Sequence, residues 1–326
     1  MKKIIPLFIL TLLLLGCCGF IPWGGSKDEF EMIPKSANAV VILKPSFILN
    51  DSDLSSLYSS SSEINSEMSR AEETTGINPE KIDRLVLFFE LDSLTQQSES
   101  YGGFIASGAI DKDKILEKMK LNNVVTELNY NNHVMYEVSP EEMPENKTYF
   151  AFIGGNIISG GNVLVGGTEE AVKDSIDLDA GKGESIRSRG NLSRIYDNFD
   201  KNSFFIFMIE SSQDIKQSMN TGLGPLNLSA LSHTDSLGLS VNKAGHDIDF
   251  KLMLLADGAT GANNISKLLE KTISLVKGVS KSGSSLETVL TNIKIKTTGT
   301  EVSVSLTSTI DELSNAYDAI SALSTS

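Results

Sequence analysis

The stretch GNVLVGGT, residues 161–168, is the part of the chain closest to a motif with a chemical function. Its spacing and its closing Thr168 fit the phosphate-binding loop G-x-x-x-x-G-K-[ST], but Gly167 stands where the lysine belongs. A phosphate loop turns the N–H groups of its middle residues toward the anion, whereas the middle of this stretch is apolar and strand-like. Two glutamates follow, which suit a helix N-terminus but repel a phosphate. We therefore predict a strand and then a helix capped by Thr168, without a nucleotide site.

The three histidines are the next candidates, because imidazole can bind zinc or act as a general base. They are His133, His233 and His246. His246 opens the run His-Asp-x-Asp, in which alternate strand residues would turn two carboxylates to one face and toward a hard cation. A polar hairpin edge explains the same run, and His133 and His233 lie in polar turn and loop sequence. We therefore predict no catalytic residue, no metal site and no cofactor.

Carboxylates are abundant, and an exterior hydrolase acting on glycans would need two of them across a cleft. The sequence does not single out such a pair. The pairs Asp111/Asp113 and Asp177/Asp179 are acidic enough for a surface cation, but helix caps and solvated faces explain them as well. The G-x-S-x-G elbow of serine hydrolases is absent. A carboxylate-based hydrolase therefore remains an alternative to a non-enzymatic protein.

The N-terminus carries a targeting signal. Two lysines precede an apolar stretch, residues 4–15, which is typical of a secretory signal peptide. The run LLGC, residues 14–17, then resembles the lipobox of prokaryotic lipoproteins. This resemblance implies cleavage before Cys17 and a lipid on its sulfur. Cys18 is either a second acylation site or a bystander.

An uncleaved transmembrane anchor is the alternative to lipidation. Residues 4–23 are largely apolar, and a spanning helix needs ~20 such residues. Trp23 would then lie at the membrane interface. Gly16, Gly19 and two prolines disfavour a spanning helix in this stretch. Both anchors place the rest of the chain outside the cytoplasmic membrane, at its outer face.

The composition excludes some partners and some sites. The net charge is −14, and it becomes −16 when residues 1–16 with their two lysines are removed. Such a surface repels nucleic acid, so we exclude DNA and RNA as partners. The only two cysteines lie side by side at the anchor, so the globular part can form neither a disulfide nor a thiolate metal site.

Five N-x-[ST] sequons are glycosylation candidates if the organism glycosylates its exterior. They lie at Asn50, Asn146, Asn191, Asn227 and Asn264. Their number is close to chance in a chain so rich in Asn, Ser and Thr, so it says nothing about function.

Behind the anchor, the hydrophobic pattern predicts two copies of one plan. The predicted boundaries are 1–16 for the signal peptide, 17–29 for the lipid anchor and tether, 30–185 for module 1, 186–202 for a connector helix and 203–326 for module 2. Each module follows the order β-α-β-β-α-β-β-α, and the first adds a strand or two before its last helix. This segregation favours an α+β fold of mainly antiparallel sheets with helices packed on one face.

The predicted elements can be given by residue number. In module 1, strands are expected at 39–43, 82–91, 103–110, 124–128, 133–138, 149–153 and 162–165, and helices at 54–71, 111–119 and 169–176. In module 2, strands are expected at 204–209, 237–241, 248–255, 293–296 and 302–306, and helices at 212–219, 265–279 and 311–323. The runs ILEKM (115–119) and LLEKT (268–272) are a local echo between the two modules.

One loose family resemblance follows from these features. The run IPKSA, residues 33–37, leads into an apolar strand behind a lipobox, and strand-helix modules follow. This arrangement is similar to that of uncharacterised surface lipoproteins of archaea and some bacteria, and the resemblance implies no activity.

The predicted function is that of a membrane-anchored extracytoplasmic lipoprotein, non-enzymatic, that binds a protein or envelope polymer, acts as a scaffold or maintains the envelope. The alternatives are the glycan hydrolase and a carrier that holds an apolar ligand between sheet and helices.

Overall fold

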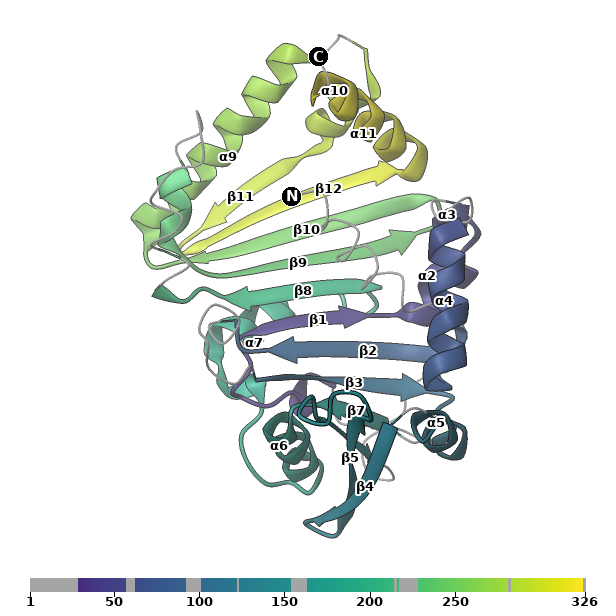
Figure 1. Cartoon of the computed structure of the whole chain (residues 1–326). Coiled ribbons are helices and arrows are strands. Elements are labelled where there is room, and N and C mark those ends of the chain that lie inside the picture. The colour runs from purple at the N-terminus through teal and green to yellow at the C-terminus, as the bar shows by residue number, and fades with distance from the viewer. Residues whose placement is uncertain are drawn as a thin grey trace. The chain divides into compact units, whose positions relative to one another are not determined.

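The computed structural model divides the chain into two compact units. It describes residues 29–56, 62–91, 101–121, 123–153, 163–213, 216, 228–280 and 283–324. Unit 1 is Met1–Arg189 and unit 2 is Gly190–Ser326, so the division falls inside the predicted connector. Each unit contains an antiparallel sheet together with helices (Figure 1). The α+β fold class is therefore confirmed.

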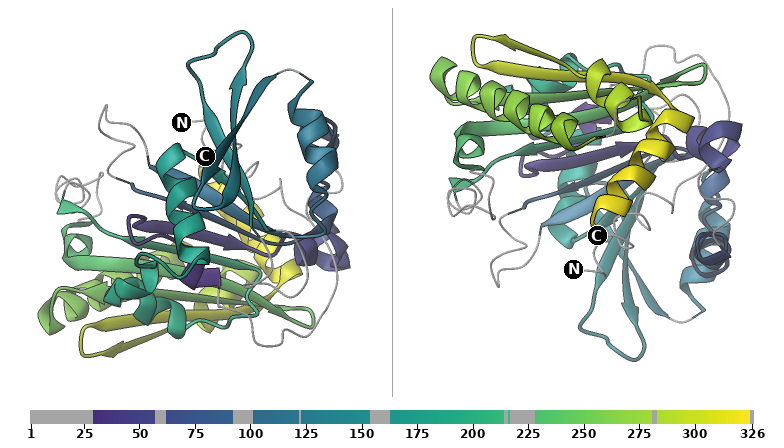
Figure 2. Two further views of the ribbon diagram at one scale, coloured as in Figure 1. Left: turned by 90° about the horizontal axis from the view of Figure 1, so that it is seen from below. Right: turned by 90° about the horizontal axis from the view of Figure 1, so that it is seen from above.

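Unit 1 contains seven strands among its described residues. Its elements are η1 (Glu29–Met32), β1 (Ala39–Leu43), α2 (Pro45–Asn50), α3 (Ser52–Ser56), α4 (Ser62–Thr75), η2 (Pro79–Lys81), β2 (Ile82–Phe89), β3 (Gly102–Gly108), α5 (Lys112–Met119), β4 (Asn123–Tyr130), β5 (His133–Pro140), β6 (Thr148–Ile153), β7 (Val163–Gly167), α6 (Glu169–Asp179) and η4 (Ile186–Ser188). The strand order is β1-β2-β3-β7-β6-β5-β4, with antiparallel neighbours. The β4–β5 hairpin therefore ends this sheet, as the left view of Figure 2 shows.

Unit 2 contains five strands among its described residues. Its elements are α7 (Gly190–Asp197), β8 (Phe205–Glu210), η5 (Leu228–His233), β9 (Thr234–Ala244), β10 (Asp247–Ala256), α9 (Ala259–Val279), α10 (Ser285–Asn292), β11 (Lys294–Thr298), β12 (Glu301–Thr309) and α11 (Ile310–Ser324). The strand order is β11-β12-β10-β9-β8, again with antiparallel neighbours. Most of the helix predicted at 212–219 lies outside the described residues, so the repeated element order is not established here.

Local signals explain two differences from the predicted helices. The helix predicted at 54–71 begins earlier, with α3 at Ser52, because the Asp51 carboxylate caps it by accepting from the N–H groups of Asp53 and Leu54; residues 57–61, between α3 and α4, lie outside the described part of the chain. Helix α10 was not predicted. The Ser284 hydroxyl accepts from the N–H of Glu287 at 3.3 Å, and the Glu287 carboxylate accepts from the N–H of Gly283 at 2.6 Å.

The helices bury apolar side chains that recur at helical spacing. Helix α6 buries Ala171, Val172 and Ile176 completely, and it packs against β6 and β7. In unit 2, Ile265 of α9 packs in a cluster with Leu254 of β10 and Val302 of β12. A second cluster joins α10 to α11 through Leu286, Val289, Leu290 and Ala316. Each buried Val, Leu or Ile side chain contributes roughly 1.5–3 kcal/mol through the hydrophobic effect.

The prediction that the helices cover one face of the sheet is wrong at the β5–β6 end of unit 1. The side chains of neighbouring residues on a strand point to opposite faces. Glu137 of β5 binds Tyr149, on the face where α6 lies. The adjacent Tyr136 lies on the other face, where the Nζ atom of Lys112 of α5 is 5.7 Å from the centre of its ring. Helix α6 and the start of α5 therefore flank the sheet from both sides, because both faces carry apolar residues here.

Candidate functional site

The stretch resembling a phosphate loop is a strand followed by a capped helix. Its first two residues lie outside the described part of the chain, and Val163–Gly167 form β7. The Thr168 hydroxyl accepts from the N–H of Ala171 at 3.4 Å and caps α6, as predicted. The middle residues are buried and paired with β3 and β6, so their N–H groups do not form a cradle for an anion.

The glycines at the end of β7 serve close packing. Gly167 has a φ of +149°, and a Cβ atom there would lie 2.6 Å from the Cα of Gly103 and even nearer to the carbonyl oxygen of Gly102. A Cβ on Gly166 would lie 2.5 Å from the Phe104 ring and 2.7 Å from the Phe150 ring. Those two rings meet edge to face with their centres 6.1 Å apart. These glycines let β3, β7 and β6 approach one another beneath an aromatic pair.

His133 and His233 each lie close to a carboxylate. The His133 Nε2 atom is 3.7 Å from Asp179, and the His233 Nδ1 atom is 2.9 Å from Asp257. His246 is exposed in the turn between β9 and β10. Within the described residues, no three His, Cys, Asp or Glu side chains form a group able to hold a metal ion. The sequence could not have revealed either pairing, because 46 and 24 positions separate the partners.

A polar cluster joins the tip of the β4–β5 hairpin to the end of α6. The Tyr130 hydroxyl donates to Asp177 at 2.8 Å, and the Asn131 side-chain amide donates to the same carboxylate at 2.5 Å. His133 faces Asp179, whose side chain is 8% exposed and whose Oδ1 atom has no hydrogen-bond partner among the described residues. The hydrogen bond to Asp177 raises the pKa of Tyr130 above its usual range. The predicted Asp177/Asp179 pair is therefore engaged in holding the hairpin.

A second group of charges continues along the same face of α6. The Glu137 carboxylate binds Lys147 at 3.0 Å and accepts from the Tyr149 hydroxyl at 2.9 Å. These bonds hold the pKa of Glu137 below its usual range. Burial, followed by the hydrogen bond to Glu137, raises the pKa of Tyr149. Helix α6 contributes the ion pair between Glu169 and Lys173, which lowers the pKa of Glu169.

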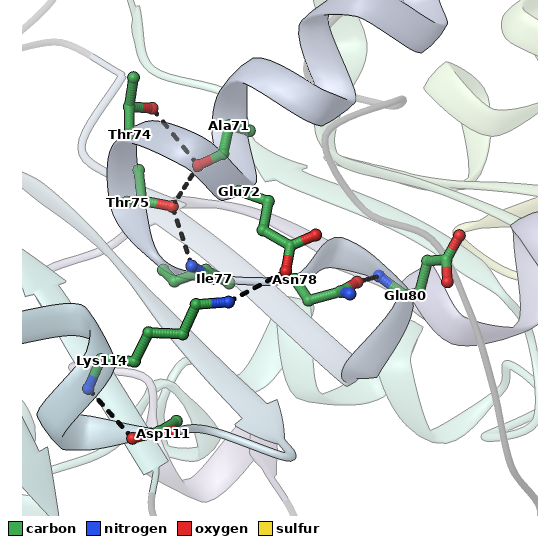
Figure 3. Close-up of polar contacts among 9 residues, drawn as sticks. All are labelled: Ala71, Glu72, Thr74, Thr75, Ile77, Asn78, Glu80, Asp111 and Lys114. Atoms are coloured by element: carbon green, nitrogen blue, oxygen red, sulfur yellow. Dashed lines mark hydrogen bonds and ion pairs between the residues drawn. The ribbon is translucent and has the colours of Figure 1, made fainter. Parts of the chain in front are cut away.

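One hollow among the described residues of unit 1 lies at the start of α5. It measures about 600 Å³ and is lined by Lys81, Ala109, Ile110, Asp111, Lys112 and Asp113. Figure 3 shows the bonds beside it: Asp111 caps α5 by accepting from the N–H of Lys114, and the Lys114 ammonium binds Glu72 of α4 at 3.0 Å. The carboxylate of Asp111 is thus occupied in capping the helix. Two lysines and two aspartates mix their charges around this hollow, which suits neither an apolar ligand nor a strongly charged one.

The second hollow, of about 260 Å³, lies near the end of α6. It is lined by Glu31, Leu178, Gly181, Lys182, Gly183, Ser185 and Arg187. The Arg187 guanidinium lies over the ring of Phe30, 5.0 Å from its centre. This hollow is smaller than the ~300–1,000 Å³ typical of small-molecule sites.

The two end strands β4 and β11 differ in their exposed side chains. Strand β4 has eight residues with a single charge, Glu127, and it contains Val124, which is 54% exposed. Leu121, just before it, is 63% exposed. Strand β11 has five residues, and both of its lysines, Lys294 and Lys296, are exposed. Proteins commonly protect sheet edges with short strands and lysines, a protection that β4 lacks.

The predicted modification sites are only partly described. Cys17, Cys18 and Asn227 lie outside the described residues, as does the alternative anchor at residues 4–23. Three sequon asparagines, Asn50, Asn146 and Asn264, are exposed, whereas Asn191 is half-buried at the start of α7. In the part of the chain that the structure describes, no helix is long and apolar enough to cross a membrane.

Comparison with known proteins gives no family and no activity. No protein-family model matches the chain, and no curated protein matches it. Among solved structures, crystal form III of TP0453 has a TM-score of 0.49 and 10% identity, over 90% of this chain and 99% of that one. Crystal form I of TP0453 has a TM-score of 0.45 and 11% identity, over 91% of this chain and 99% of that one. A likeness at this level says nothing about the function of this chain.

Proposed function

We propose that the protein is an extracytoplasmic lipoprotein at the outer face of the cytoplasmic membrane that binds a protein partner and has no catalytic activity. The N-terminal signal and the LLGC run support the anchor. One observation carries the binding role: β4 is an eight-residue end strand on which Val124 is exposed, close to the exposed Leu121 that precedes it. The N–H and C=O groups along such an edge can pair with a further strand, a common mode of peptide and protein recognition.

The described hollows and carboxylates favour binding over the two alternatives. A carrier of apolar ligands needs a mainly apolar cavity, whereas the larger hollow is bordered by two lysines and two aspartates. A hydrolase needs two carboxylates free to reach substrate. Asp111 caps a helix, and Asp177 binds Tyr130 and Asn131.

We also infer that the two units are diverged copies of one α+β module. The strand order β1-β2-β3-β7-β6 in unit 1 corresponds to β8-β9-β10-β12-β11 in unit 2, and this correspondence supports the inference. In both units the last two strands form a consecutive hairpin that precedes a helix. Unit 1 then differs by the β4–β5 hairpin, inserted between α5 and β6 and added beyond β6 in its sheet.

The anchor is tested by replacing Cys17 with Ser and fractionating the cells. We expect the variant to leave the membrane fraction or to retain its uncleaved signal, with a changed apparent mass. Cys18→Ser is the matched control and should change little. A Cys17→Ser protein that stays in the membrane with unchanged mass contradicts lipidation at Cys17.

The binding role is tested by a photo-crosslinking amino acid at Val124 of β4 in living cells. We expect discrete protein adducts from this position. The same amino acid at Lys296 of β11 is the control and should give few. Equal labelling from the two strands contradicts a binding role for β4.

A further inference from the structure

The turn of the β4–β5 hairpin determines which backbone groups of β4 point outward. Asn131 and Asn132 both have positive φ, +47° and +66°, and they form a two-residue turn. In such a hairpin the residues that flank the turn, Tyr130 and His133, form a hydrogen-bonded pair, and the pattern alternates along the strand. The even-numbered residues of β4 therefore bond to β5. The N–H and C=O groups of Val125 and Glu127, like those of the other odd-numbered residues, point away from it.

These outward groups lie along a regular strand. The β4–β5 register runs without interruption from Asn123 to Tyr130, so no bulge twists the edge away. Strand β4 contains no proline, and within the described residues it pairs only with β5 (Figure 1). The four odd-numbered residues of β4 point these groups outward, which is enough for about eight further backbone hydrogen bonds, because each hydrogen-bonded pair contributes two.

We infer that β4 pairs with β4 of a second copy of this chain, antiparallel and about a two-fold axis perpendicular to the sheet, with Thr126 opposite Thr126. This inference rests on the proposed binding function and names its partner. A two-fold contact uses the same surface on both copies, so a strand that matches itself is sufficient.

The register follows from the requirement that opposite residues share a face. The two-fold axis keeps each residue on its own face, so only residues an even number of positions apart can be opposite. The two central choices therefore place Thr126 opposite itself or Glu127 opposite itself. The second choice sets like charges directly opposite each other, which destabilises a sheet.

The Thr126 register also brings the exposed Val124 opposite a half-buried leucine. Val124 then lies opposite Leu128 of the second copy, twice by symmetry, and Val125 lies opposite Glu127. Cross-strand apolar pairs of this kind stabilise a sheet. Leu121, exposed just before β4, extends the same apolar edge. A junction of one strand pair is small, but anchoring both copies in one membrane raises their effective concentration.

Disulfide trapping in the full-length, membrane-anchored protein tests this register. In the Thr126 register that residue is a non-hydrogen-bonded pair, with Cα atoms ~4.5 Å apart, within the range a disulfide requires. In a Cys18→Ser background, Thr126→Cys should form a disulfide dimer on mild oxidation at least tenfold faster than Thr298→Cys. Thr298 is an exposed threonine on β11 and is the matched control.

Two further variants fix the register. Val124→Cys should form little dimer alone but should form it readily when combined with Leu128→Cys. A Glu127→Cys dimer that forms faster than the Thr126→Cys dimer overturns the register. Thermal unfolding monitored by circular dichroism confirms that each variant is folded before it is scored.

The outcomes separate this inference from the proposed function. Crosslinks from Val124 to a different protein, with no Thr126→Cys dimer, overturn self-pairing and leave the binding role intact. If position 124 gives no protein crosslink and Thr126→Cys gives no dimer, both the self-pairing and the binding role are overturned. Trapped Thr126→Cys dimers together with self-adducts from Val124 support both.

Discussion

The order β1-β2-β3-β7-β6 in unit 1 corresponds to β8-β9-β10-β12-β11 in unit 2. The units differ in the strands that follow β6 and β11 in this order. Unit 2 ends at β11, a five-residue strand with two exposed lysines. Unit 1 continues into the β4–β5 hairpin, which is joined to α6 by Tyr130 and His133. Polar bonds to α6 hold the tip of this hairpin, and Met135, Tyr136 and Val138 of β5 are buried. The edge strand of unit 1 is therefore β4, which lacks the short length and the lysines of β11.

The units also differ in the pairing of β3 with β7 in unit 1 and of β10 with β12 in unit 2. In unit 1 this contact pairs Gly103 with Gly167 and Phe104 with Gly166. In unit 2 the corresponding contact pairs Leu252 with Val304 and Leu254 with Val302. The β3–β7 contact of unit 1 thus has glycines at one end, beside the aliphatic pairs Ile105–Val165 and Ala106–Leu164, whereas the β10–β12 contact of unit 2 has aliphatic side chains at the corresponding positions.

The largest effect is expected from Gly167→Ala in unit 1. The new Cβ would collide with the backbone of Gly102 and Gly103, which cannot move aside as a side chain can. The positive φ of Gly167 adds strain for any residue that has a Cβ. We expect a loss of roughly 2–4 kcal/mol in the free energy of unfolding, measured by urea denaturation. Gly181→Ala has positive φ but nothing within 4 Å, so it should cost only about 1 kcal/mol. Equal losses would contradict the close-packing role.

Because its side chain would meet the same backbone, Gly167→Lys, which restores the phosphate-loop consensus, should destabilise the protein without creating ATP binding in calorimetry.

A smaller effect is expected from Gly238→Ala in β9 of unit 2. Its Cβ would meet the side chains of Ile195, the nearest, and Phe199, at 2.9 Å, which lie in and just after α7. Side chains can shift where backbone cannot, so we expect a loss of roughly 1–3 kcal/mol. Adding Ile195→Ala should restore part of it, which a double-mutant cycle would detect as coupling. Strict additivity of the two losses would show that α7 does not pack through this glycine.

The helix caps should have similar effects in the two units. Thr168→Ala removes the cap of α6, and Thr309→Ala removes the hydroxyl that accepts from the N–H of Glu312 at 3.2 Å in α11. Each should cost about 1 kcal/mol in denaturant unfolding. Serine at either position keeps the hydroxyl and should restore most of the stability. A full loss with serine would show that the methyl group, not the cap, is responsible.

The smallest effect concerns pH. Hydrogen bonds from the Ser308 hydroxyl and the Thr309 N–H hold the pKa of Glu312 below its usual range. A lowered folded-state pKa contributes stability above the unfolded pKa of ~4.3, and this stability is lost as pH falls through the folded value. Glu312→Gln should therefore flatten the stability curve below about pH 5, measured by urea midpoints. An unchanged slope would contradict the bonded carboxylate.

Local patterns predicted much of the fold, because helices and strands each require apolar residues at a characteristic spacing along the sequence. The strand at Ala39–Leu43 and the Thr168 cap are confirmed. Helix α10 was missed although its capping box, Ser284 with Glu287, is a short-range signal. The polar cluster at α6 could not be predicted. Tyr130 and Asp177 are 47 positions apart, and only the strand order brings them together.

Amide hydrogen exchange on the membrane-anchored protein tests the central claim, that β4 is a pairing edge and β11 is not. The amides to follow are those of Val125 and Glu127, which point outward from β4, and that of Thr297 in β11. At low surface density all three should exchange quickly. At high density Val125 and Glu127 should be protected at least tenfold, with Thr297 unchanged. Fast exchange of Val125 and Glu127 at every density would contradict the account.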